Sequence, residues 1–106
     1  MDIRQQLAAA SGFDWGEGNL EKNLEKHDVA FWEAEEAFFN RPLVLRIDES
    51  HSVSESRFYA LGRTDSGRRL FVGFTMRGAL IRVISTRDMT RREIAAYRHH
   101  EKDTDS

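Results

Sequence analysis

The spacing of apolar residues changes along this chain, from a helical period before Pro42 to a strand period after it. In the first part, Leu20, Leu24 and His27 fall on one side of a helix, and Phe31 begins a second row of the same kind. His27 therefore lies on or beside the apolar side of its helix. We predict helices over 3–10, 17–27 and 31–39.

After Pro42, apolar and polar residues alternate, and short polar segments suited to hairpin turns separate the alternating runs. Thr90 and Glu93 have the spacing of a capping box, which predicts a last helix that ends near His100. The polar residues 101–106 that follow are predicted to be a flexible, disordered tail. The predicted strands are 43–48, 57–63, 69–76 and 80–86, preceded by a short aromatic edge strand at 13–15.

This order of elements predicts one α+β domain over residues 1–106, with residues 1–12 as an N-terminal extension. The N-terminal helices come first and an antiparallel meander of about four strands follows. A C-terminal helix then closes the domain.

Charge divides the chain into two unlike parts, which a sequence pI near 6.1 conceals. Residues 1–56 hold five Lys or Arg against twelve Asp or Glu, a balance of −7. Residues 57–98 hold ten Arg and no Lys against three acidic residues, a balance of +7. This asymmetry predicts binding to a polyanion or a charged partner, because arginine binds phosphate through two parallel hydrogen bonds. The alternative is that these arginines are solvated on strand surfaces.

Several classes of site lack the residues that they need. The chain has no cysteine, and its four histidines do not have the spacing of metal ligands on a helix. It contains no glycine-rich phosphate loop. We therefore expect neither a metal nor a cofactor. No apolar run is long enough for a secretion signal or a membrane span, so we expect a cytoplasmic protein.

Strand alternation separates the arginines by their surroundings. It places Arg63 on the same side of its strand as Tyr59, and Arg82 on the same side as Ile84 and Thr86. In a meander, Arg63 and Arg82 could then project near each other. Three further arginines fall in turns and are predicted to be solvated, namely Arg68, Arg69 and Arg77.

More cations are predicted where the last helix begins. Arg87 follows the end of its predicted strand, and Arg91 and Arg92 begin the helix. The first turn of a helix adds backbone N–H donors and a positive dipole end, which favour anions. Together with Arg63 and Arg82, these three arginines form the predicted phosphate-binding surface.

RNA is cleaved without a metal when a base takes the 2′-hydroxyl proton, cations stabilise the phosphorane and an acid protonates the leaving oxygen. His27 is the candidate acid or base because imidazole titrates near neutral pH; the alternative is a structural histidine at a helix end. Lys22 and Lys26 share a helix side and either contact phosphate or pair with Glu25. Tyr97 either stacks on a base, donates a proton or packs at the core.

A set of short motifs runs in order from Phe13 to Tyr97. Its members are Phe13-Asp14-Trp15, Asn23, Lys26-His27, Phe31, Glu33-Ala34, His51, Glu55, Arg57-Phe58, Leu61-Gly62-Arg63, Phe74-Thr75, Arg77-Gly78, the run from Ile81 to Arg87, the run from Thr90 to Glu93, and Tyr97. Each motif alone is weak. In this order and spacing the set resembles the BrnT family of toxins from bacterial type II toxin–antitoxin operons.

The resemblance implies a RelE-like fold and a ribonuclease that cleaves RNA without metal or cofactor and inhibits translation. It also implies a cognate antitoxin with a ribbon-helix-helix domain, which neutralises the toxin and, with it, binds operator DNA to repress the operon. Combined with the strand pattern, it favours His27, Arg63, Arg82 and Arg87 as the catalytic residues. The expected RNA contacts are Lys22, Lys26, Arg91, Arg92 and Tyr97.

The chain departs from the family pattern at Gly16, Asn19, Asp28 and Ala30, where the family usually has Asp, Lys, Gly and a Ser-like cap. Asn19 removes a cation from the helix that carries His27, and Asp28 places an anion beside it. These changes motivate an alternative function, a catalytically degenerate homologue that binds an antitoxin and co-represses the operon. A third hypothesis, RNA binding without cleavage, has less support because stacking motifs of exposed aromatic residues are not evident.

Overall fold

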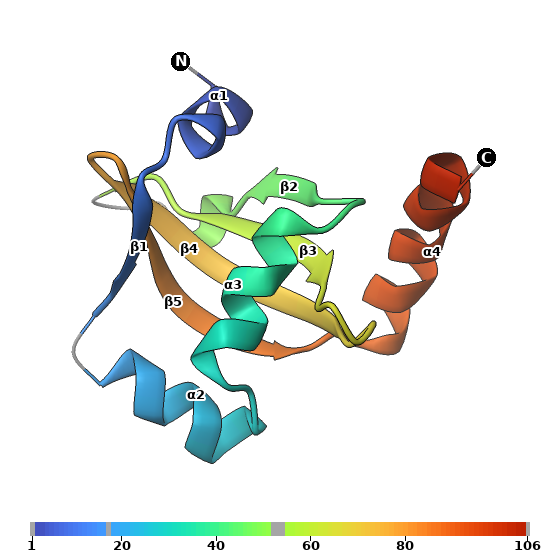
Figure 1. The fold of residues 1–106 in the computed structure, drawn as a ribbon, viewed down its shortest axis with the longest axis horizontal. Coiled ribbons are helices and arrows are strands. Elements are labelled where there is room, and N and C mark those ends of the chain that lie inside the picture. The colour runs from blue at the N-terminus through green and yellow to red at the C-terminus, as the bar shows by residue number, and fades with distance from the viewer. Residues whose placement is uncertain (1, 17, 52–54, 106) are drawn as a thin grey trace.

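The computed structural model describes residues 2–16, 18–51 and 55–105, which form a five-stranded sheet with helices packed against it (Figure 1). None of the helices in these ranges combines the length and the apolar character that crossing a membrane requires. In chain order the elements are α1 (Ile3–Ala8), β1 (Gly12–Trp15), α2 (Asn19–His27), α3 (Phe31–Phe39), β2 (Val44–Ile47), the short 3-10 helix η1 (Glu49–His51), β3 (Phe58–Arg63), β4 (Arg69–Arg77), β5 (Leu80–Asp88) and α4 (Arg91–Asp105).

The strands lie in the order β1-β5-β4-β3-β2. Strands β2 to β5 form an antiparallel meander, as alternation and turn residues predicted. β1 joins the free edge of β5 and runs parallel to it, which confirms the predicted edge strand. The predicted α+β architecture, with N-terminal helices, a four-strand meander and a C-terminal helix, is confirmed.

Helices α2 and α3 pack on one side of the sheet, here named the helix face (Figure 1). Ala34 and Ala37 are fully buried on the inner side of α3, and their small side chains let the helix approach closely. Gly62 of β3 lies beneath α3, and a Cβ atom added there would be 2.8 Å from the carbonyl oxygen of Ala37. The sheet residues of this core are Ala60, Leu70, Val72, Phe74, Ile81 and Val83.

Helix α4 packs against the opposite side of the sheet, toward one end of it. Tyr97 of α4 is fully buried there with Val44, Leu61 and Met89, and Ile94 packs against the same cluster. The sheet residues that continue this side beyond the cluster, here named the open face, include Tyr59, Phe71, Gly73, Arg82 and Arg87.

A β-bulge in β5 reverses its side-chain alternation. The register against β4 shifts at Ile84, which has no partner in the ladder. Beyond the bulge, Thr86 turns to the helix face, where it is fully buried and its N–H donates to Oδ1 of Asn23 at 3.2 Å. Arg87 consequently joins Arg82 on the open face. The predicted grouping of Arg82 with Thr86 is therefore wrong, because alternation was extended through a bulge that the sequence does not mark.

Two predicted boundaries are also wrong. Helix α4 continues to Asp105, so residues 101–105 of the predicted tail are helical, and residue 106 lies outside the described residues. Its last turns are held at Glu101, whose carboxylate pairs with two arginines of the sheet at 3.2 and 2.9 Å. Strand β5 continues to Asp88, so Arg87 lies inside the strand and not beyond its end.

Replacing Gly62 by alanine tests how closely α3 packs on β3. The new methyl group would meet the Ala37 carbonyl oxygen at 2.8 Å. We expect the free energy of unfolding to fall by about 1–3 kcal/mol, measured by urea denaturation. Gly12→Ala is the matched control, because its methyl group would meet Leu80 at 3.6 Å, an ordinary contact. Equal losses in the two variants would contradict the close approach at Gly62.

Candidate functional site

Arg87 is the most firmly positioned cation of the open face. Its guanidinium carbon lies 4.0 Å from the ring centre of Phe71. The Phe71 ring stacks on that of Tyr59, with 5.1 Å between the two ring centres. Its two terminal nitrogens donate to the two carboxylate oxygens of Glu93 at 2.8 and 3.0 Å. Nη1 also donates to the carbonyl oxygen of Asp88 at 3.1 Å, and Nε donates no hydrogen bond to any residue in the described ranges. The structure therefore presents a fixed guanidinium with a donor left for an anion.

Glu93 both caps α4 and holds Arg87. Its Oε1 accepts the N–H of Thr90 at 2.9 Å, and its own N–H donates to the Thr90 hydroxyl, which confirms the predicted capping box. Burial acts to raise the pKa of Glu93, but the hydrogen bonds from Arg87 and Thr90 and the positive charge of Arg87 outweigh it. The pKa of Glu93 is consequently lowered, so the carboxylate stays charged beside Arg87 at neutral pH.

Arg82 lies farther along β5 from Arg87, on the same face. It is paired across the sheet with Thr75, and its Nη1 is 3.3 Å from Oδ2 of Asp14 in β1. The stretch of β5 between Arg82 and Arg87 spans about 15 Å at the usual rise per residue. Both arginines thus flank one surface, but a single phosphate group does not reach both.

The open face is hollowed between these two arginines. A cavity of about 180 Å³ lies there, with Arg57, Phe71 and Ser85 among its lining residues. Gly73 forms part of its floor, and a Cβ atom added there would be only 2.9 Å from Oγ of Ser85. The hollow therefore combines an aromatic ring, a guanidinium and a hydroxyl with the carboxylate of Asp48.

The predicted proximity of Arg63 and Arg82 is wrong. Arg63 ends β3 opposite Arg69, whereas Arg82 is paired with Thr75 near the other end of β4. The two positions are about 20 Å apart along the sheet. The antiparallel register explains the error, since the end of β3 lies beside the start of β4. Arg63 instead pairs with Glu101 of α4.

His27 ends α2 and its side chain is exposed. The guanidinium of Arg68 donates to the carbonyl oxygens of His27 and Asp28 at 3.3 and 2.8 Å, and pairs with Asp88 at 2.7 Å and Glu33 at 3.2 Å. Arg68, predicted to be a solvated turn residue, thus fastens the end of α2 to the end of β5.

The charges at this end of β5 act on one another. The hydrogen bond from Arg68 lowers the pKa of Asp88; burial opposes it, and the charges of Arg68 and His27 lower it further. The hydrogen bond to Asp88 in turn contributes most to raising the pKa of Arg68. Because Asp88 directly follows Arg87, the candidate acid or base and the best positioned cation lie at the same end of the strand.

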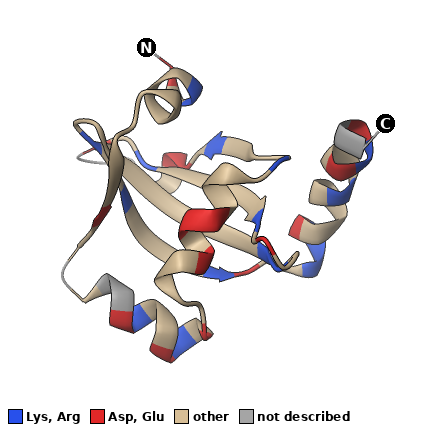
Figure 2. Ribbon diagram, in the orientation of Figure 1, with Lys and Arg blue, Asp and Glu red and all other residues tan. Residues whose placement is uncertain are grey.

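Four further predicted contacts are exposed cations that border this end. Lys22 and Lys26 lie on α2, and Arg91 and Arg92 begin α4. Basic segments on α2, at the end of β5 and along α4 are visible in Figure 2. No carboxylate within the described ranges pairs with these four side chains, including Glu25. They add positive charge around the end of β5 without being fixed in place.

Tyr97 is not an RNA-contact residue in this structure. It is 0% exposed, and its hydroxyl donates to the carbonyl oxygen of Pro42 at 2.6 Å. Burial is the main cause that raises the pKa of Tyr97 to about 12. A base cannot stack on it, and its proton is committed to the core. The position of Tyr97 on α4 directs its side chain toward the sheet, where it packs against Val44 and Leu61.

Three site residues were missed by the sequence analysis. Phe71 and Tyr59 supply the aromatic support of Arg87, and Arg68 holds the end of α2. Alternation did place Tyr59 on the side of Arg63, so a signal was present for that residue.

In the ranges described, no three His, Asp or Glu side chains gather as ligands of one metal ion.

Asp28 caps α2 in the left-handed conformation, with φ 54° and ψ 39°. Glycine adopts this conformation without the steric cost that a Cβ atom brings. An aspartate at this position therefore has a local conformational cost, although the Asp28 carbonyl still accepts from Arg68.

Asp28→Gly should consequently stabilise the protein by about 0.5–1 kcal/mol, through relief of the left-handed strain. Thermal and urea denaturation measure the change. Asp28→Ala is the control, because it removes the same carboxylate but keeps a Cβ atom. A gain in Asp28→Ala as large as in Asp28→Gly would assign the effect to charge and not to the backbone.

Glu93→Gln tests the charged part of the cap. A carboxylate with a lowered pKa stabilises the fold above its unfolded pKa of about 4.3, and this contribution is lost as pH falls through its folded pKa. We expect the variant to lose about 1 kcal/mol at neutral pH and to approach the parent protein in acid. Urea denaturation over a pH series measures this. In an Arg87→Ala background most of the difference should disappear; its persistence would exclude Arg87 as the cause.

The fold and these motifs match known proteins. Residues 15–93 match the model of the ribonuclease toxin BrnT of type II toxin–antitoxin systems. The structure is similar to the crystal structure of the Brucella abortus ribonuclease toxin BrnT, with TM-score 0.53 and 20% identity, over 76% of this chain and 97% of that one. A search of curated proteins finds no match. Because the family model covers most of the chain, this protein belongs to the BrnT family of ribonuclease toxins of type II toxin–antitoxin systems.

Proposed function

We propose that this protein is a metal-independent endoribonuclease whose active site lies around the end of β5, where Arg87 projects from the open face and α2, on the helix face, ends at His27. Family membership supports ribonuclease chemistry. The observation that carries the location is the guanidinium of Arg87, held between Phe71 and Glu93. His27 lies at the same end of β5 and supplies an imidazole, the side chain that most often serves as a general acid or base.

In this proposal, His27 takes the proton of the ribose 2′-hydroxyl, and the 2′-oxygen attacks the adjacent phosphorus. The P–O5′ bond breaks, and the imidazolium returns the proton to the O5′ leaving group. The products are a 2′,3′-cyclic phosphate and a 5′-hydroxyl end. Arg87 stabilises the added negative charge of the phosphorane through Nε, the donor that Glu93 does not occupy.

The other cations have supporting roles in the proposal. Lys22, Lys26, Arg91 and Arg92 attract the RNA backbone around the end of β5. Arg82, at the other side of the hollow, contacts a phosphate away from the cleaved bond. The remaining predicted catalytic residue, Arg63, is reassigned to a structural role, because Glu101 of α4 holds it far from Arg82.

The finer expectations from the family resemblance are part of the same proposal. Cleavage of mRNA inhibits translation, and the fold is of the RelE-like type. The protein acts in the cytoplasm. A ribbon-helix-helix antitoxin neutralises it and recruits it to operator DNA, which the toxin itself does not contact.

Arg87→Ala should reduce RNA cleavage by about 100-fold, because it removes the fixed donor to the phosphorane. Purified protein and a labelled RNA give the rate, and induced expression gives growth arrest and mRNA decay in cells. Arg82→Ala should mainly weaken RNA binding, and the double variant should relieve the arrest. Loss of activity in His27→Ala would support its role as acid or base.

Arg77→Ala is the matched control. Arg77 ends β4, is exposed and pairs with Glu55 at 3.3 Å, so its loss removes equal charge away from the proposed site. The variant should keep nearly full activity. If Arg77→Ala and Arg87→Ala reduce cleavage equally, net charge and not a fixed guanidinium explains the effect. Intact RNA with folded parent protein would overturn the ribonuclease proposal.

A second function is favoured by the pairing of the predicted catalytic arginines. Arg63, Arg82 and Arg87 each have a carboxylate partner. Asp28 adds an anion next to His27. A degenerate toxin that only binds its antitoxin and strengthens operator repression fits this balance. The same expression assay separates the two functions: enhanced operator binding by the antitoxin, with neither growth arrest nor RNA decay, would favour the degenerate toxin.

A further inference from the structure

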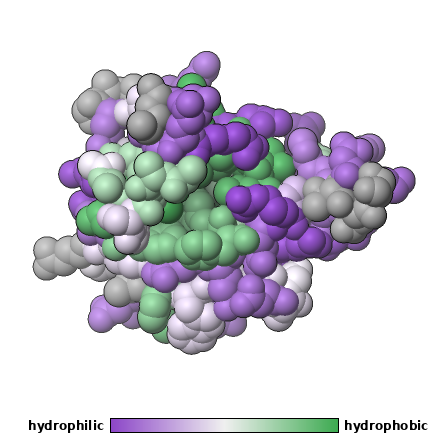
Figure 3. Space-filling model, turned by 45° about the horizontal axis from the view of Figure 1, so that its top comes forward, coloured by the Kyte–Doolittle hydropathy of each residue, from purple (hydrophilic) through white to green (hydrophobic). Residues whose placement is uncertain are grey.

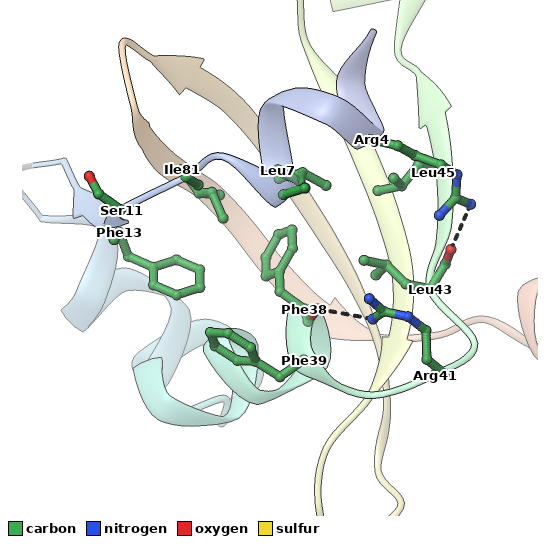
Figure 4. Close-up of a pocket in the computed structure, with 13 residues that line it drawn as sticks. Arg4, Leu7, Ser11, Phe13, Phe38, Phe39, Arg41, Leu43, Leu45 and Ile81 are labelled. Carbon is green, nitrogen blue, oxygen red and sulfur yellow. Dashed lines mark hydrogen bonds between the residues drawn. The ribbon is translucent and has the colours of Figure 1, made fainter.

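An apolar groove of about 470 Å³ opens on the helix face, between α1, β1, α3 and the start of β2 (Figure 4). It lies on the opposite side of the sheet from Arg87, because its floor includes residues of the helix-face core. In the space-filling view, one large apolar area lies between hydrophilic parts of the surface, with smaller apolar patches elsewhere on that face (Figure 3). The apolar lining includes Leu7, Phe13, Phe38, Phe39, Leu43 and Ile81.

The aromatic side of the groove ends in an exposed ring. Phe39, the last residue of α3, is 75% exposed, an unusual position for a large apolar side chain. Its ring packs edge-on to Phe13 at 6.1 Å, and Phe13 contacts Phe38 at 5.6 Å. The three rings therefore form a fixed apolar shelf, of the kind that receives apolar side chains of a partner.

Two arginines border the groove, and both donate to backbone carbonyl oxygens, whereas several arginines of the sheet pair with carboxylates. Arg4 donates to the carbonyl oxygen of Leu43 at 3.0 Å, and Arg41 donates to those of Phe38 and Asn40 at 3.4 and 3.1 Å. Within the described ranges, no carboxylate pairs with Arg4 or Arg41. The rim therefore keeps two uncompensated positive charges, which complement an acidic partner.

The wall that α1 provides belongs to this chain's N-terminal extension and lies outside the residues that match the family model, 15–93. Ile3 and Leu7 of α1 pack against the core, and Arg4 is bonded to the backbone before β2. A capping box between Asp2 and Gln5 starts the helix. The wall is thus built into the fold, and it encloses a groove that the matched region alone does not form.

We propose that this groove binds a segment of the cognate antitoxin in which apolar side chains are flanked by acidic residues. Membership of a type II toxin–antitoxin family supplies the partner, so the inference does not rest on the ribonuclease proposal. The aliphatic residues of the lining, Leu7, Leu43, Leu45 and Ile81, favour the apolar side chains of a protein over the bases of an RNA strand. A second copy of this chain is disfavoured, because a symmetric contact would bring the two basic rims together.

The position of the groove gives the segment a distinct task. Since it lies behind the sheet, a segment bound there leaves the open face uncovered. It therefore acts as an anchor that sets affinity and partner choice, while another part of the antitoxin covers the open face. The extension would then let this toxin select its own antitoxin among those of related operons.

Calorimetric titration with the purified product of the adjacent antitoxin reading frame tests the proposal. Phe39→Asp should weaken binding by about 30-fold or more, and Arg41→Glu by about 10-fold, with the latter loss shrinking at high salt. Trp32→Asp is the matched control, since Trp32 is also an exposed aromatic of α3, 56% exposed, but outside the groove. It should bind like the parent protein.

Several outcomes would overturn the proposal. Unchanged affinity of folded Phe39→Asp and Arg41→Glu places the antitoxin elsewhere, and a loss confined to Trp32→Asp places it over the start of α3. Self-association in sedimentation that Phe39→Asp abolishes would make a second copy the occupant. RNA cleavage by Phe39→Asp should equal that of the parent protein. If the parent cleaves no RNA, the binding results still decide the groove separately from the ribonuclease proposal.

Discussion

The guanidinium of Arg68 joins the two parts of the molecule that meet at the candidate site. It binds backbone carbonyls at the end of α2, including that of His27, and pairs with Glu33 of α3 and Asp88 of β5. A partly buried charge is costly when it loses its partners, so the end of α2 cannot leave β5 without that cost. The position of His27 relative to Arg87 follows from this constraint.

Ion pairs of the same kind neutralise part of the opposite charges that the two parts of the chain carry. Three of them join acidic residues of the first part to arginines of the second, namely Asp14 to Arg82, Glu33 to Arg68 and Glu55 to Arg77. The basic part is therefore compensated partly inside the fold, and only some of its arginines are left for a partner. Counting charges along a sequence does not separate these two uses, because pairing depends on the register of the sheet.

Local patterns were enough for the elements and their order. Alternation located the meander, and the Thr90 and Glu93 spacing located the start of α4. The site was less predictable, since Arg87 reaches the open face only through the bulge at Ile84. The prediction that Tyr97 contacts RNA was wrong for a related reason. A tyrosine among polar neighbours on a helix looks accessible until the sheet beneath it is known.

The shared use of Glu93 has an evolutionary consequence. One carboxylate starts α4 and also holds Arg87, so a lineage that lost enzymatic activity would still be selected to keep the pair for folding. The side chain of His27 is exposed and donates no hydrogen bond within the described ranges, so selection for folding would not preserve it. Relatives of this chain that have lost enzymatic activity should therefore vary at the position of His27 but keep the pair of Arg87 and Glu93.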